Sequence, residues 1–138
     1  MKNQRGATAV EFAIVFPLLI LVMFGIIEFS IILYDKAMIT NASREGARAG
    51  IVSQSPRVDI PTIQGVVDNY CRLYLISFRS GAAPVTTVER TGLTFGSELR
   101  VTVTYTYSFL ALPEFMKIFV RDTLGPLDLR AVTVMRME

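Results

Sequence analysis

The sequence has no histidine, a single cysteine among 138 residues, and no block of basic residues. Without histidine the chain lacks the commonest general base and the commonest metal ligand. One cysteine, Cys71, cannot form an internal disulfide, so it says little about redox compartment. The net charge of +2 is spread along the chain, and this excludes an electrostatic footprint for nucleic acid.

Signatures of catalysis are also missing. The sequence contains no nucleophile motif, no metal-ligand cluster and no phosphate-binding loop, and its carboxylates and hydroxyls show no recognisable pairing. The sequence therefore argues against a membrane-anchored enzyme. We expect a protein that is not an enzyme and has no cofactor, no metal ion and no small-molecule substrate.

What the chain has in excess is hydrophobicity, at 51% apolar residues and a mean hydropathy of +0.45. Residues 12–34 form a run of 23 residues in which Glu28 is the only charge. As a helix this run is about 34 Å long, against about 30 Å of hydrocarbon in a bilayer. The run is too long for the apolar core of a cleaved signal peptide, so it predicts one retained span with membrane lipid as a partner. Basic residues flank it on both sides, and counting them leaves its orientation open.

The span belongs to a longer helical pattern. Residues 8–49 contain no strong breaker, Pro17 should at most kink the helix, and Gly50 is a plausible stop. Such a helix is about 60 Å long, so its last third must project beyond the bilayer.

The projecting part carries a stripe of small residues, Ala42, Gly46 and Gly50, at intervals of four. This spacing favours close packing against another element, although Gly50 alone fits an ordinary helix end equally well. Arg44, Glu45 and Arg48 lie partly beside the stripe. They are either a solvated face with a weak Glu45–Arg48 pair or polar contacts to neighbouring subunits.

The rest of the chain predicts a small α+β domain. A second helix should run from residue 60 or 61 to about residue 78, with Asp59 as its cap, Pro61 in its first turn and Gly81 after its end. Helical spacing predicts that one stripe is buried, with Cys71 beside it as a small core residue. The residues of that stripe are Ile63, Val66, Val67, Tyr70 and Tyr74.

Three strands are expected over residues 85–90, 99–109 and 127–137, and a turn at Thr91-Gly92 separates the first two. The second has the clearest alternation of apolar and polar residues, which is typical of a strand with one covered and one wet face. Residues 110–120 are apolar, and Pro113 can start a short helix there. Its Phe115, Met116 and Phe119 either close the small core or form an exposed contact patch.

Four blocks of this sequence closely resemble the TadE-like proteins, the pseudopilins of the tight-adherence (Flp) pilus in the type IV filament superfamily. The blocks lie at residues 5–12 (RGATAVEF), 16–19 (FPLL), 24–29 (FGIIEF) and 42–48 (ASREGAR). They occur in register over about a third of the chain. The ending at residues 131–138 also looks like the usual TadE-like ending.

The resemblance implies a processing event. Prepilin peptidase cuts such proteins after a glycine like Gly6 and leaves a new N-terminus like Ala7. Glu11 is then the fifth residue, where prepilins keep a glutamate. Its carboxylate could neutralise the ammonium group of a neighbouring subunit, because buried charges are tolerable when paired. Read alone, Glu11 could equally be a carboxylate at the membrane interface.

The resemblance also implies a pilin-like organisation: a leader at residues 1–6, a long helix at 7–50 with its span at about 12–34, and a small α+β domain at 51–138. The N-terminus would be cytoplasmic and the domain periplasmic, on a single span of the bacterial inner membrane. Pro17 would adjust the helix for packing. We expect Glu28 to make an inter-subunit contact, and the simpler alternative is a snorkelling or protonated glutamate.

The implied function is that of a minor pseudopilin, because Flp-type major pilins are much shorter than this chain. It would serve pilus assembly or adhesion, with or without incorporation into the extracellular pilus. Its partners would be prepilin peptidase, other pilins and pseudopilins, and the inner-membrane assembly platform. The alternative is a single-span anchor that carries a periplasmic binding or scaffold domain and never enters a filament.

Overall fold

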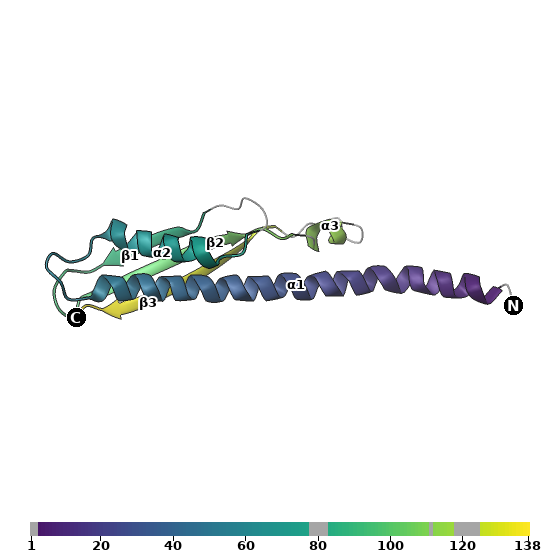
Figure 1. Cartoon of the computed structure of the whole chain (residues 1–138), viewed down its shortest axis with the longest axis horizontal. Helices are drawn as coiled ribbons and strands as arrows, with labels where there is room; N and C mark the ends of the chain where they lie inside the picture. Colours follow the sequence, from purple (N-terminus) through teal and green to yellow (C-terminus); the bar gives the residue numbers. More distant parts are fainter. Residues whose placement is uncertain (1–2, 78–82, 111, 118–124) are drawn as a thin grey trace. The chain divides into compact units, whose positions relative to one another are not determined.

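A computed structural model describes residues 3–77, 83–110, 112–117 and 125–138 of the chain. The α+β fold is confirmed (Figure 1). The elements in chain order are α1 (Asn3–Ile51), α2 (Ile60–Tyr74), β1 (Val85–Arg90), β2 (Glu98–Tyr107), α3 (Leu112–Met116) and β3 (Leu127–Arg136). The chain forms two compact units: the first holds Met1–Ile31 and Phe109–Gly125, the second Ile32–Ser108 and Pro126–Glu138.

Helix α1 is the long helix that the sequence predicts. It is continuous over 49 residues with Pro17 inside it, and it ends at Ile51, one residue beyond the predicted stop at Gly50. Among the described residues it is the single helix long and apolar enough to cross a membrane. A helix suits that environment because it satisfies every backbone hydrogen bond within itself.

Helix α2 begins as expected, with Asp59 at the N-cap position and Pro61 in the first turn, although the Asp59 side chain makes no capping hydrogen bond. The predicted end near residue 78 is wrong, because α2 ends at Tyr74 and Leu75 is extended. Phe78 and Gly81 lie outside the described residues.

The predicted buried stripe of α2 is only partly right. The buried residues are Ile63, Val67 and Cys71, four apart, whereas Tyr74 is 47% exposed. Val66 and Tyr70 are half-buried, and the Tyr70 and Tyr74 rings contact each other with centroids 4.6 Å apart. A spacing of four follows a narrower face than the predicted stripe, so both tyrosines fall at its margin.

The three strands form one antiparallel sheet in the order β1-β2-β3. Val85 pairs with Thr104 across β1 and β2, and Val103 pairs with Ala131 across β2 and β3. Strand β2 ends at Tyr107, two residues before the predicted end, and β3 ends at Arg136, one residue before it. The loop between β1 and β2 turns at Gly96, whose φ of +82° is a conformation that suits glycine.

The core of the second unit lies on one face of this sheet. The apolar residues of β2 alternate inward, as predicted from their period of two, and are buried. The C-terminal part of α1 and helix α2 pack on that face: Gly46 of α1 lies against Val67 and Val101, and Gly50 lies against Ile63 and Leu99. The Ser43 hydroxyl is 2.7 Å from the Thr133 hydroxyl, which adds a polar contact between α1 and β3.

Candidate functional site

The residues of the predicted processing point lie in the first turns of α1. Gly6, Ala7 and Glu11 are all exposed, and no atom lies within 4 Å of the position that a Cβ on Gly6 would take. In the described part of the chain the Glu11 carboxylate has no hydrogen-bond or ion-pair partner. The segment is therefore accessible to an enzyme or to another subunit.

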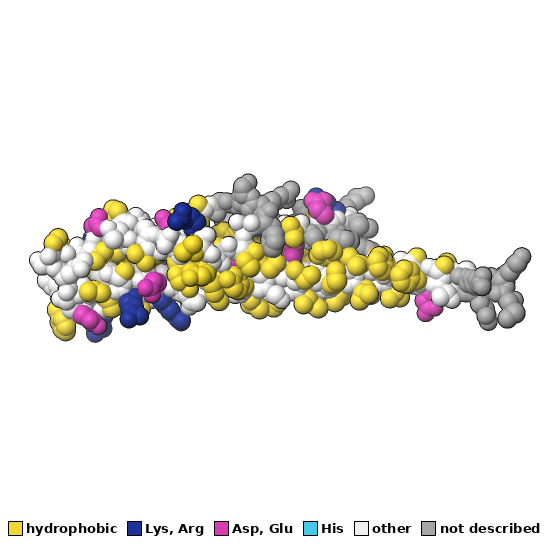
Figure 2. All heavy atoms as spheres, viewed as in Figure 1, with side chains coloured by type: hydrophobic (Ala, Val, Ile, Leu, Met, Phe, Trp, Pro, Cys, Tyr) yellow, Lys and Arg dark blue, Asp and Glu magenta, His cyan; other side chains and the backbone are white. Residues whose placement is uncertain are grey.

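The apolar residues that follow Glu11 are exposed around α1. Figure 2 shows hydrophobic side chains covering this part of the helix, and none of its most apolar window is buried. Phe12 and Phe16 stack with centroids 5.2 Å apart, and both remain exposed. Pro17 lines a shallow apolar depression together with Ala13, Ile14, Leu18 and Leu21. Exposing this apolar surface to water would cost free energy, so we expect lipid or other helices to cover it.

Glu28, the charge inside the predicted span, is only 2% exposed. Its Oε1 accepts a hydrogen bond from the backbone N–H of Leu112 at 3.2 Å. The side chain therefore has an intramolecular role, which its sequence position alone does not reveal. Its assignment as an inter-subunit contact stays a prediction.

The small-residue stripe is a packing surface inside the chain. Ala42, Gly46 and Gly50 are all buried, and Gly46 and Gly50 lie against α2 and β2. A Cβ on Gly50 would lie 2.7 Å from Cδ1 of Ile63, and one on Gly46 would overlap Val67. These glycines allow the backbone of α1 to approach its neighbours closely.

The three charged residues beside the stripe, Arg44, Glu45 and Arg48, are exposed. Within the ranges that the structure describes, Glu45 and Arg48 form no ion pair. Their side chains are available to solvent or to another subunit, and the predicted inter-subunit contacts remain a prediction.

Sequence reasoning missed Asp35, the first residue after the apolar run of residues 12–34. Asp35 is fully buried, and its Oδ1 accepts the backbone N–H of Ile76 at 3.0 Å. Its Oδ2 has no hydrogen-bond partner. Burial raises the pKa of Asp35, and the Ile76 hydrogen bond opposes that shift. No sequence signal separates this aspartate from one that simply ends an apolar run.

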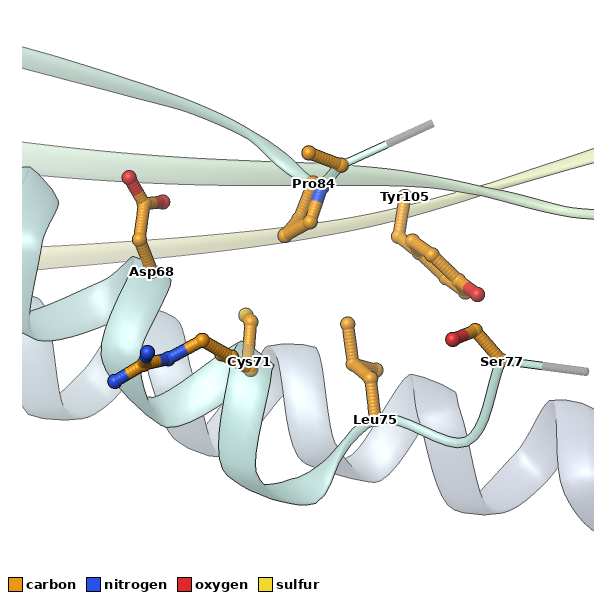
Figure 3. Close-up of a pocket in the computed structure, with 8 residues that line it drawn as sticks. Asp68, Cys71, Leu75, Ser77, Pro84 and Tyr105 are labelled. Carbon is orange, nitrogen blue, oxygen red and sulfur yellow. The ribbon is translucent and has the colours of Figure 1, made fainter. Parts of the chain in front are cut away.

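A cavity of about 400 Å³ opens between the end of α2 and the sheet. Figure 3 shows Cys71 of α2, and Leu75 just after its end, pointing toward Pro84 and Tyr105. Burial and the nearby Asp68 raise the pKa of the Cys71 thiol to about 11, so the thiol stays protonated at neutral pH. Cys71 is buried on α2 beside Val67, which confirms the prediction that it is a small core residue. Burial, together with Asp35, also raises the pKa of Tyr105.

In the described ranges no group of three or more His, Cys, Asp or Glu side chains could hold a metal ion. The predicted site residues do not form one cluster but lie in three separate parts of the structure. The stripe lies in the packed domain, Glu28 contacts the start of α3, and Gly6, Ala7 and Glu11 lie on an exposed helix end.

Comparison with known proteins finds a family match over α1. The model of the family described as TadE-like protein matches residues 6–48, which begin at Gly6 and cover most of α1. No curated protein and no solved structure gives a significant match. The resemblance seen in the sequence is thus confirmed over this helix.

Proposed function

We propose, from the TadE-like match over residues 6–48, that this chain is a minor pseudopilin of a tight-adherence (Flp) pilus. The family match indicates involvement in pilus assembly, and the single apolar helix fits a single-span membrane protein. The finer role, a subunit that primes, caps or supports the filament, is our proposal. The observation that carries it is a family match that begins at a glycine and continues along a lipid-compatible helix.

The first step of the proposed function is removal of residues 1–6 by prepilin peptidase. Gly6 is exposed, and the space around its Cα is open. A peptidase that must reach the Gly6–Ala7 bond therefore meets no obstruction from the described part of the chain. The leader would lie on the cytoplasmic side and residues 51–138 on the periplasmic side of the inner membrane.

The second step is entry into an assembly of pilin-type subunits. Cleavage would place an ammonium group on Ala7, four residues from the exposed carboxylate of Glu11. In an apolar helix bundle, pairing that ammonium with the Glu11 carboxylate of a neighbour would remove an isolated charge. The exposed apolar surface of α1 supports packing with other pilin helices after it leaves the bilayer. In this proposal the chain is a structural subunit without catalysis of its own.

Mass spectrometry of the full chain, from cells with and without prepilin peptidase, tests the processing step. We expect a mature N-terminus at Ala7 only when the peptidase is present. Gly6→Leu should block cleavage, whereas the control Ala9→Leu, at another exposed position on α1, should be processed normally. Full-length protein in both strains would overturn the proposal and favour a single-span anchor that stays out of the filament.

A further inference from the structure

Glu28 connects two segments that are 84 residues apart in the sequence. Its Oε1 accepts the backbone N–H of Leu112, the first residue of α3. The Leu112 side chain lies over Gly25, where an added Cβ would be 3.7 Å from Cδ1 of Leu112. The start of α3 is therefore held against α1 at Gly25 and Glu28.

These contacts lie within the apolar run of α1. Glu28 is six residues before the end of the run at residue 34, which corresponds to about 9 Å along a helix. The hydrocarbon core is about 30 Å thick, so a run of this length places Glu28 below the membrane surface and above the midplane. The start of α3, which is hydrogen-bonded to Glu28, therefore lies at the same depth.

The attached segment has the chemistry that this depth requires. We call residues 109–110 and 112–117 the α3 segment. It begins with Phe109 and Leu110, and Leu110 is 44% exposed. Its charged side chains, Glu114 and Lys117, form an ion pair with 2.6 Å between Oε1 and Nζ, and both are exposed. Apolar residues combined with a charged pair that can reach the headgroups are typical of a helix in the membrane interface.

We propose that the α3 segment is a second membrane contact, inserted among phospholipids in the leaflet that holds the C-terminal end of the span. The first N–H groups of a helix have no partner within that helix, and in lipid an unsatisfied N–H is costly. Glu28 supplies an acceptor for the Leu112 N–H at that place. Glu28 is thus a positioning residue for the α3 segment, and Leu110 adds an exposed apolar side chain in the same compact unit as the span.

The depth of Leu110 tests the membrane contact directly. The full chain with Cys71→Ala and a fluorescent label at Leu110→Cys is placed in phospholipid vesicles that contain a lipid-attached quencher. Phe29→Cys, an exposed position on the span, is the control for lipid contact, and Leu73→Cys, an exposed position on α2, is the control for water. We expect the label at position 110 to be quenched as strongly as the label at position 29.

Quenching at position 110 no stronger than at position 73 would overturn the proposal. A label at position 110 that is shielded from water in assembled pili but is not quenched in vesicles would also overturn it. That result would assign the surface to another protein subunit. The vesicle measurement needs neither peptidase cleavage nor pilus assembly, so its result is independent of the proposed pseudopilin function.

Two substitutions test the positioning role of Glu28. Glu28→Gln keeps a carbonyl oxygen that can accept the Leu112 N–H, whereas Glu28→Ala has no acceptor. We expect the label at position 110 to lose its lipid quenching in the Glu28→Ala protein and to keep it in the Glu28→Gln protein. Unchanged quenching at position 110 in both variants, with position 29 still in lipid, would overturn that role.

Discussion

Oδ1 of Asp35 accepts a hydrogen bond from the backbone N–H of Ile76 at 3.0 Å, joining α1 to the chain just after α2. The N–H of Leu75 still bonds to the carbonyl of Cys71, but the next N–H is directed to Asp35 and not to a helical carbonyl. Helix α2 therefore ends four residues earlier than its sequence pattern predicts.

This contact predicts an unusual pH dependence. The ordinary pKa of an aspartate is 3.8, and burial raises the pKa of Asp35 in the folded chain. On acidification the folded state binds a proton before the unfolded state does, so this group adds stability as the pH falls through its folded pKa. That stability is complete below 3.8 and is lost as the pH rises through the folded pKa.

Asparagine cannot ionise, so Asp35→Asn should raise the melting temperature of the full chain at pH 7. It should also remove the stability that the wild-type chain gains from Asp35 as the pH falls toward 4. Thermal unfolding in detergent, followed by circular dichroism, measures both effects. Asp128→Asn is the matched control: Asp128 is exposed on β3 and accepts the Thr106 hydroxyl, so its effect should stay within about 0.5 kcal/mol. An Asp35→Asn protein less stable than wild type at pH 7 would contradict the prediction.

Gly46→Ala should destabilise the domain. The new Cβ would overlap Cγ2 of Val67, and overpacking of this kind costs about 1–3 kcal/mol. Gly65→Ala is the control within α2, because no atom lies within 4 Å of its Cβ position. That change should stabilise the chain by up to about 1 kcal/mol through helix propensity. Denaturant unfolding of the full chain distinguishes the two, and equal stabilisation by both changes would disprove the close approach of α1 to α2.

Cys71 should react slowly with a maleimide in the folded chain at pH 8. Cys71 is 1% exposed, so the reagent can hardly reach the thiol, and its pKa is raised to about 11, so little of the reactive thiolate is present. Urea should restore the ordinary rate. For comparison, Leu73→Cys in a Cys71→Ala chain provides an exposed thiol on the same helix and should react rapidly without urea. Equal rates in the two folded proteins would mean that Cys71 is not a core residue.

Glu11→Ala should reduce piliation and leave the fold unchanged. An unpaired buried charge costs about 3–5 kcal/mol, and each 1.4 kcal/mol changes an association constant about tenfold. Electron microscopy should show pilus numbers reduced more than about tenfold, while circular dichroism remains that of wild type. Glu89→Ala, at an exposed carboxylate on β1, should leave piliation intact. Wild-type numbers of pili from the Glu11→Ala strain would rule out the charge-pairing role.

Much of the fold could be predicted because its signals are local. The long apolar helix, the start of α2 at Ile60, the 85–90 strand and the alternation along β2 all follow from periodicity, breakers and caps. The close packing of Gly46 and Gly50 was also predicted, although their partners were not. The segment from Gly6 to Glu11 could be named because a short local motif carries it, and the roles assigned to its residues stay predictions.

The sequence by itself determined the membrane-length helix, the TadE-like resemblance and the α+β class, because each depends on residues that are close together in the chain. Only the tertiary structure decided what the charges at the end of the apolar run do. Glu28 contacts Leu112 and Asp35 contacts Ile76, across 84 and 41 residues. The role of such a carboxylate depends on which backbone N–H the fold brings to it, and a pattern of neighbouring residues cannot contain that information.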